Sequence, residues 1–339
     1  MDQNGNAVDW FLVYKLPKIR HRTGTLFGDG LEFFYMDSNH PKWLLSPVPI
    51  NESDQAIAYT LNQIYQDKSS EVNYFMYNDE KPSGSVSLNH GHTKGTLGFD
   101  TQSGFWLIHS APGFPPEKGE GYQWAENASD FGQSFLCVTF LYSTLGVLGK
   151  QLVINYPQVY DKYLSKDVMS DYQILSDVGT RPSEQFPVSN VEHFSTKDGV
   201  PLTSFAKFTT FGAGKYYLQS LRWLVAPTLK EQLLVETWRN GPQHDWLPTN
   251  CSGPYKVYNI VQVDLPGNLV FNVHKDHSKY AISFPANSNW VCVGDINRET
   301  TQFKRGGGTL CFQHPDVWQS FMNIVTFFEP CQLSKMCKS

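Results

Sequence analysis

Two copies of the motif His-x-Lys, His92-Thr93-Lys94 and His277-Ser278-Lys279, stand 185 residues apart in this chain. An imidazole can attack phosphorus or, when it is protonated, donate a proton to a leaving oxygen. An ammonium group supplies positive charge to the non-bridging oxygens of a phosphodiester. Two imidazoles and two ammonium groups brought together therefore predict a site that cleaves phosphodiesters. Its predicted catalytic groups are His92, Lys94, His277 and Lys279.

The segments that follow the two motifs also match. The same offset aligns Phe99 with Phe284 and the apolar run 105–108 with 290–293. A repeat of this length is typical of two copies of one supersecondary unit. A third tripeptide, His40-Pro41-Lys42, lacks the apolar run and is interpreted as a surface turn. Either distant copy alone could be an exposed strand end, so it is the matched pair that favours a shared site.

Polar residues end the apolar run in both copies. His109 and Ser110 follow the first run, and Asp295 and Asn297 follow the second. Polar side chains at strand ends commonly reach the site of a sheet protein. We therefore expect His109 to support proton transfer and the other three to bind phosphate or to hold a histidine tautomer. For each of these residues taken alone, capping of a loop is an equally good interpretation.

Arg305 precedes three glycines, Gly306-Gly307-Gly308. Such a segment can present backbone N–H groups and one guanidinium to a phosphate, which makes Arg305 a candidate substrate-binding residue. A glycine triplet is more often a turn, and the turn is the favoured interpretation of the glycines.

Apolar periodicity indicates the elements that must position these residues. Strands are predicted at 8–15, 31–36, 73–77, 191–195 and 204–210, and a hairpin at 94–99 and 104–108. A helix is predicted over 56–65, capped by Ser53 or Asp54. Residues 160–178 resemble a helix, and helical spacing from Trp318 to Phe328 predicts a closing helix. Strands alternating with helices in both halves indicate an α/β fold.

A chain of 339 residues is long enough for two lobes of about 150 residues each. Residues 179–182, Gly-Thr-Arg-Pro, are the predicted linker. We therefore expect an N-terminal lobe over residues 1–170 with the first motif and a C-terminal lobe over residues 185–339 with the second. No apolar run approaches the roughly 20 residues of a membrane helix, so no membrane partner is expected. The polar first residues show no signal peptide, and we presume that one is removed.

Net charge is −5 with neutral histidines, which disfavours binding to a polyanion at pH 7. The chain holds ten histidines, so full protonation would change the net charge to +5. With an ordinary histidine pKa near 6.5, the sign reverses at about pH 5 to 6. The composition therefore permits a polyanion binder that works in acid, although many slightly acidic proteins share this arithmetic.

The cysteines and the glycosylation sequons favour the secretory pathway. Three sequons begin at Asn51, Asn127 and Asn250. Five of the six cysteines lie in the last 90 residues, and none has the spacing of a zinc site. We expect disulfides in the C-terminal half, no bound metal and no cofactor. The expected location is lysosomal or secreted.

Several blocks of the sequence resemble one family. The paired His-x-Lys resembles the phospholipase D superfamily, and Gly294-Asp295-Ile296-Asn297 looks like a variant of its second motif element. Phe99 and Phe284 stand where that superfamily carries carboxylates. That departure points to one branch of the superfamily, and several other blocks of the sequence resemble this branch, deoxyribonuclease II. Those blocks are 8–17, 91–95, 104–110, 276–279 and 305–311.

The resemblance implies a fold of two phospholipase D-like lobes, related by a pseudo-twofold axis, with a central cleft between mixed sheets. It implies an endonuclease active in acid without a metal, a monomer or homodimer, that cleaves double-stranded DNA and leaves 3′-phosphate ends. His92, His109 and His277 correspond to the important histidines of that family. Following the superfamily, we assign His92 as the nucleophile and His277 as the acid.

The resemblance also implies the disulfides Cys251–Cys331 and Cys292–Cys311. Cys137 corresponds to a cysteine that pairs near the N-terminus in that family, and Cys337 is the alternative partner here. Two other functions stay open at this point. One is a secreted, catalytically silent homologue that binds DNA or a host protein. The other, weaker one is a phospholipase.

Overall fold

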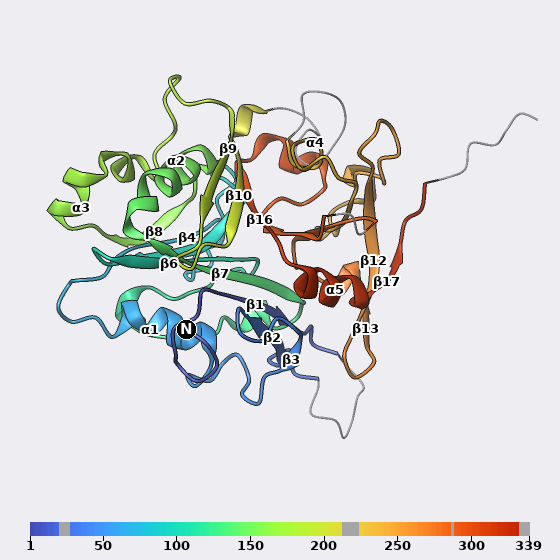
Figure 1. The fold of residues 1–339 in the computed structure, drawn as a ribbon, viewed down its shortest axis with the longest axis horizontal. Helices are drawn as coiled ribbons and strands as arrows, with labels where there is room; N and C mark the ends of the chain where they lie inside the picture. Colours follow the sequence, from blue (N-terminus) through green and yellow to red (C-terminus); the bar gives the residue numbers. More distant parts are fainter. Residues whose placement is uncertain (20–27, 212–223, 286–287, 332–339) are drawn as a thin grey trace, which may run out of the picture.

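The chain folds around two large β-sheets that share one core (Figure 1). The computed structural model describes residues 1–19, 28–211, 224–285 and 288–331. Strands of residues 10–163 make the first sheet, and strands of residues 189–328 make the second. Most strand pairs in both sheets are antiparallel, and helices are few, so the α/β class is confirmed in its broad sense.

The first sheet has the strand order β3-β2-β1-β7-β6-β5-β4-β8. Its strands are β1 (Trp10–Lys15), β2 (Phe33–Asp37), β3 (Leu44–Leu45), β4 (Asn73–Asn78), β5 (Lys94–Phe99), β6 (Ser103–His109), β7 (Gln133–Leu141) and β8 (Val159–Tyr163). The predicted hairpin is confirmed, because β5 and β6 pair with Gly95 opposite Ile108.

The second sheet has the order β13-β12-β11-β14-β15-β16-β10-β9, and β17 pairs with β12. Its strands are β9 (Ser189–Ser195), β10 (Pro201–Lys207), β11 (Leu233–Glu236), β12 (Val257–Leu265), β13 (Leu269–Asn272), β14 (Tyr280–Ser283), β15 (Trp290–Gly294), β16 (Gly307–Gln313) and β17 (Val325–Phe328). The segment after the second motif therefore forms the pair β14 and β15, as its likeness to the first hairpin predicts.

Five strands follow one another in the same way in the two sheets. The first sheet contains the run β1-β7-β6-β5-β4, and the second contains β10-β16-β15-β14-β11. In each run the earliest strand lies beside the latest, and the other three follow in reverse chain order. In both runs the His-x-Lys motif lies at the start of the fourth strand, β5 or β14.

Helices cover the sheets. They are α1 (Ala56–Tyr65), α2 (Leu145–Asn155), α3 (Lys166–Asp171), α4 (Val225–Leu229) and α5 (Pro315–Ile324). In Figure 1, α1 lies on one side of the first sheet, and α2 and α3 lie on the other. The inner core joins apolar residues of both sheets with α2 and α5, whereas α1 and α4 cover separate outer cores.

The structure confirms some predicted helices and corrects others. Helix α1 has the predicted bounds, but Gln55 caps it, because its side chain accepts hydrogen bonds from the N–H groups of Ile57 and Ala58. The closing helix ends at Ile324, and the next four residues pair with β12 as strand β17. The stretch 160–178 is mostly not α-helical: α3 spans six residues of it. Pairing with a neighbouring strand overrides local helical spacing in the closing segment.

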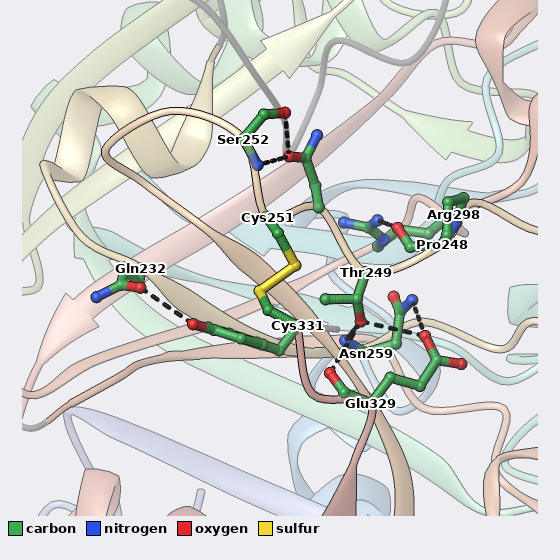
Figure 2. The surroundings of a disulfide bond; sticks show 11 residues. Gln232, Pro248, Thr249, Cys251, Ser252, Asn259, Arg298, Glu329 and Cys331 are labelled. Carbon is green, nitrogen blue, oxygen red and sulfur yellow. Dashed lines mark hydrogen bonds between the residues drawn. A yellow bond between two sulfur atoms is a disulfide. The ribbon is translucent and has the colours of Figure 1, made fainter. Parts of the chain in front are cut away.

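Both disulfides implied by the resemblance are present, Cys251–Cys331 and Cys292–Cys311. Figure 2 shows Cys251–Cys331 joining the loop before β12 to the chain after β17. Beside it, Glu329 accepts hydrogen bonds from Thr249 and Asn259. Cys137 is buried, and no disulfide partner of it lies among the described residues. The predicted link to Cys337 falls outside them.

Candidate active site

The first half-site is built around His92 and Lys94 at the start of β5. The backbone N–H of His92 donates to the Gly306 carbonyl at 2.9 Å. Its Nδ1 lies 2.7 Å from the Asp295 carbonyl oxygen, which can only accept, so Nδ1 carries the proton. The lone pair of neutral His92 is therefore on Nε2. The half-site takes its orientation from two segments of the second sheet.

Asp79 balances the charges of the first half-site. Its carboxylate pairs with the Lys94 ammonium and with Nη1 of Arg305 at 3.0 Å. The same carboxylate lies 3.9 Å from Nε2 of His92. Burial alone would raise the pKa of Asp79, but the charges of Lys94, His92 and Arg305 outweigh burial and hold that pKa well below its usual range. Asp79 is therefore ionised throughout the physiological range.

All three nitrogens of the Arg305 guanidinium donate within the protein. Besides Asp79, the guanidinium binds the carbonyl oxygens of Ser87, His90 and Gly91, which lead into the first motif. Arg305 therefore acts on the site by ordering that loop and Asp79. Its predicted direct contact with substrate stays a prediction.

The interpretation of the glycine triplet as a turn is wrong, because Gly307 and Gly308 begin strand β16. The reason for glycine is space. A Cβ on Gly306 would lie 2.3 Å from the Asn155 carbonyl oxygen, and one on Gly308 would lie 2.7 Å from Nδ2 of Asn155. The close approach of helix α2 therefore excludes side chains here.

The second half-site repeats this arrangement with the roles of the sheets exchanged. The His277 N–H donates to the Gly132 carbonyl at 2.8 Å. Nδ1 of His277 lies 3.0 Å from Oε1 of Gln133, which also accepts from the Ser110 hydroxyl at 2.6 Å. With the amide oriented in this way, Nδ1 of His277 is the donor and Nε2 is free. Ser110 thus connects to His277 through Gln133.

Two aromatic rings flank His277 in the second half-site. The Trp238 ring lies edge-on to His277 with centroids 4.8 Å apart, and the Phe131 ring lies 4.6 Å from Trp238. The Lys279 ammonium donates to the His277 carbonyl at 2.7 Å. Burial, followed by the charge of Lys94, lowers the pKa of Lys279 to about 7.

Charged groups in each half-site lower the pKa of the histidine in the other half-site. Burial is the largest cause that holds the pKa of both histidines well below the usual range. The next causes for His277 are the charges of Lys279 and Lys94, and Lys279 in turn acts on His92. The four groups predicted from the repeat are therefore close enough to act on one another, and Lys94 and Lys279 bring positive charge to both histidines. Such a site attracts an anion.

Asp295, which contacts His92, and Asn297, two residues later, are both buried. The backbone carbonyl of Asp295, rather than its carboxylate, fixes the His92 tautomer. Burial raises the pKa of the Asp295 carboxyl to about 7, and Oδ2 accepts from the Gly308 N–H at 3.3 Å. Oδ1 of Asn297 has no hydrogen-bond partner among the described residues.

His109 lies on the same face of the first sheet as Lys94, because continuing the register of β5 with β6 places these two residues opposite each other. It alternates with Ser110 across the sheet, because successive side chains of a strand face opposite sides. Its ring is 1% exposed and stacks on Phe135 at 5.4 Å, with Phe114 edge-on at 5.5 Å. Burial lowers its pKa to about 3, with Lys94 as the next cause. A neutral core histidine fits this place, and its predicted part in proton transfer stays a prediction.

The remaining predicted residues lie at the surface. His40 and Lys42 are exposed, which agrees with a surface turn. The sequon residues Asn51 and Asn127 are exposed and Asn250 is half-buried. Within the described ranges, no cluster of three or more His, Cys, Asp or Glu side chains could hold a metal ion. No helix among those ranges is long and apolar enough to cross a membrane.

Sequence reasoning missed three residues that shape the site: Asp79, Gln133 and Trp238. Asp79 directly follows strand β4, so the rule that singled out Ser110 and Asp295 could have found it. Gln133 and Trp238 carry no such signal. Both contact His277 of the second motif, and only the folded chain brings them next to it.

Comparison with known sequences matches nearly the whole chain. The sequence model of the family deoxyribonuclease II covers residues 1–331. Deoxyribonuclease-2-alpha of Mus musculus is 39% identical over 338 residues, which cover 97% of this chain and 92% of that protein. Plancitoxin-1 of Acanthaster planci is 37% identical over 335 residues, with 98% and 92% covered. Deoxyribonuclease-2 of Caenorhabditis elegans is 38% identical over 359 residues, with 96% and 92% covered.

Proposed function

The chain belongs to the deoxyribonuclease II family of DNA-cleaving hydrolases, and we propose that it is an acid endodeoxyribonuclease that works through a pair of histidines. Its proposed substrate is double-stranded DNA, and its proposed products carry 3′-phosphate ends. The observation that carries this proposal is the reciprocal fixing of the two imidazoles. Each donates from Nδ1 to an oxygen of the other half of the chain, so each has Nε2 free for chemistry.

In the proposed first step, Nε2 of His92 attacks phosphorus and the bond from phosphorus to the 5′-oxygen breaks. His277, protonated at Nε2, gives its proton to that departing oxygen. Attack and departure on opposite sides of phosphorus permit in-line displacement. The carboxylate of Asp79, 3.9 Å from Nε2 of His92, supports the nucleophile assignment, because it stabilises the positive charge that the attacking imidazole acquires.

In the second step, water attacks the phosphohistidine, and His277, now neutral at Nε2, takes the proton of that water. The bond from phosphorus to His92 breaks and releases the 3′-phosphate. Both histidines return to their starting states, so protons and phosphoryl groups balance over the cycle.

The acid role requires His277 to hold a proton that burial and the charges of Lys279 and Lys94 disfavour. A phosphodiester anion between the two ammonium groups offsets those charges and raises the pKa of His277. Acidic solution raises the protonated fraction further. The lysines supply the positive charge on the non-bridging oxygens, which supports a reaction that needs no added metal.

The other predicted residues take supporting places in this proposal. Ser110 orients His277 through Gln133, and Asp295 orients His92 through its carbonyl oxygen. The amide nitrogen of Asn297, a buried side chain, is the proposed donor to a phosphate oxygen. His109 is proposed as a packing support beneath the first motif.

For the fold, we propose two phospholipase D-like lobes, over residues 1–170 and 185–339, related by a pseudo-twofold axis through a central cleft. The matched strand runs and the crossed hydrogen bonds of the two motifs support it. The shared inner core means that neither lobe is expected to fold alone. A monomer or homodimer in a lysosomal or secreted setting fits the disulfides and the acid chemistry.

The test is supercoiled plasmid incubated with the purified protein at pH 5 in excess EDTA. We expect nicked and linear DNA whose ends accept polymerase extension only after a 3′-phosphatase has acted. His92→Ala and His277→Ala should be inactive. His40→Ala is the matched control, because it alters a third, exposed His-x-Lys. Intact plasmid after long incubation would instead favour a homologue that only binds DNA or a host protein.

A further inference from the structure

Two buried lysines occupy the same place in the two sheets. Lys15 ends β1 and Lys207 ends β10, which are the earliest strands of the two matched runs. Lys15 pairs with Gln133 and Lys207 pairs with Gly307, the first residues of β7 and β16. Their side chains are 0% and 2% exposed. An ammonium group is rarely this buried unless its hydrogen bonds have a use.

Each ammonium group holds the loop that leads into the latest strand of its run. Nζ of Lys15 donates to the carbonyl oxygens of Ala128 at 2.6 Å and Ser129 at 2.9 Å. Nζ of Lys207 donates to the carbonyl oxygen of Gln302 at 3.1 Å and to that of Arg305. A lysine that served only to fill space could be a methionine, but these carbonyls need a donor that reaches them inside the core.

The two braced loops end at the residues that hold the histidines. Gly132, three residues after Ser129, accepts the N–H of His277. Gly306, directly after Arg305, accepts the N–H of His92. Each lysine therefore braces, from its own sheet, a loop that fixes the histidine of the other sheet.

We propose that Lys15 and Lys207 are a matched pair of positioning residues that set the two histidines across the interface between the sheets. The proposal rests on the proposed function for its effect on catalysis, but not for its geometry. It predicts a crossed pattern: removal of Lys15 disturbs His277, and removal of Lys207 disturbs His92.

The bracing is strongest when the lysines are charged. Burial lowers the pKa of each to about 7. The charges of Asp130, Glu32 and Asp276 act on Lys15 in the opposite direction, whereas Arg305 lowers the pKa of Lys207 further. Below about pH 6 both ammonium groups are therefore largely protonated, so the loops are held most firmly under the acidic conditions proposed for the reaction.

The experiment compares Lys15→Met, Lys207→Met and the control Lys150→Met by amide hydrogen exchange at pH 5. Lys150 pairs with Glu192 away from the site. We expect exchange at the His277 amide to accelerate about 10-fold or more in Lys15→Met with little change at His92, and the reverse in Lys207→Met. For DNA cleavage, kcat should fall about 10- to 100-fold with KM nearly constant, because a misplaced reacting group costs rate rather than binding.

Lys15→Gln and Lys207→Gln keep the test decisive if either methionine variant fails to fold, since glutamine retains a neutral donor. Exchange that accelerates equally at both histidines, or kcat at the wild-type value in both lysine variants, would overturn the proposal. The exchange pattern needs no nuclease activity. An inactive wild-type protein with the crossed pattern would therefore refute the proposed function and leave this inference standing.

Discussion

An ion pair flanks His92, whereas an aromatic pair flanks His277. At the first half-site, Asp79 binds Arg305 at 3.0 Å. At the second, Trp238 contacts Phe131 with ring centroids 4.6 Å apart. The backbone arrangement of the two half-sites is nearly the same, so the difference lies in the side chains.

The residues of the two pairs are equivalent by strand register. Continuing the pairing of β4 with β5 places Asp79 opposite Thr93, and continuing that of β11 with β14 places Trp238 opposite Ser278. These partners are the middle residues of the two motifs. In the same way, Arg305 precedes β16 by two residues and Phe131 precedes β7 by two. One scaffold therefore presents charge to one histidine and apolar rings to the other.

This difference suggests how a repeated unit can support a reaction that is not symmetric. A nucleophile and an acid need opposite protonation states at the same pH. Identical surroundings would give two histidines with the same affinity for protons. The replacement of an ion pair by aromatic rings gives the two histidines different surroundings, and four predictions test what depends on that difference.

The largest expected effect separates the two histidines by leaving group. His92→Gln and His277→Gln should each lower kcat on DNA by about 10⁴-fold. On a nucleoside 3′-(p-nitrophenyl phosphate), the leaving group needs no acid in the first step, so the first-turnover burst of p-nitrophenol in His277→Gln should be at least about 100-fold faster than its cleavage of DNA, while His92→Gln should show no burst. A burst in His92→Gln alone would exchange the two roles, and trapping the phosphohistidine by acid quench would show the same exchange.

The next effect concerns Asp79, whose loss leaves two buried cations unbalanced. Asp79→Asn should lower the free energy of unfolding by about 3 to 5 kcal/mol. A carboxyl group with a depressed pKa stabilises the fold above its unfolded pKa of about 3.9, and that stabilisation is lost only as pH falls through the folded value. Urea unfolding should therefore show the same loss at pH 5 and pH 7. A loss below about 1 kcal/mol would mean that water, not Asp79, balances the cations.

A smaller effect is expected from Trp238→Ala. Removing the indole exposes His277 to water, and because burial is the largest cause of its lowered pKa, that pKa should rise. The alkaline limb of the kcat profile should move to higher pH, with kcat at pH 5 changed by less than about tenfold. Phe131→Leu keeps an apolar side chain and is the matched control. If the alkaline limb of the kcat–pH profile did not move, its pKa would belong to a group other than His277.

The smallest effect is a slope in stability with pH. The carboxyl of Asp295 has its pKa raised to about 7, so between about pH 4 and pH 7 the folded chain holds a proton that the unfolded chain has lost. Stability should therefore fall as pH rises through this window, by up to about 1.4 kcal/mol per pH unit. Asp295→Asn keeps the carbonyl that orients His92 and should remove this part of the slope in urea unfolding at pH 4, 5.5 and 7. Equal slopes in both proteins would contradict the raised pKa.

Much of the local structure follows from neighbouring residues alone. Helix α1 and the hairpin of β5 and β6 lie where periodicity predicts them, since their signals sit within a few residues. The closing segment shows the limit of that reasoning. Val325 and Phe328 continue the helical spacing, yet they pair with β12, a strand about 60 residues earlier. A distant strand edge decides such a segment, and no local pattern reports it.

The sequence by itself predicted that two imidazoles and two ammonium groups lie close together, because a repeated motif is expected at equivalent places in two copies of one unit. The tertiary structure decided which atoms orient them. Nδ1 of His92 binds a carbonyl 203 residues away, and Ser110 and His109, although adjacent, face opposite sides of their sheet. Strand register and the cover of each sheet face fix these partners. Both are properties of the whole packed chain, which is why no local pattern in the sequence indicates Trp238 or the two buried lysines.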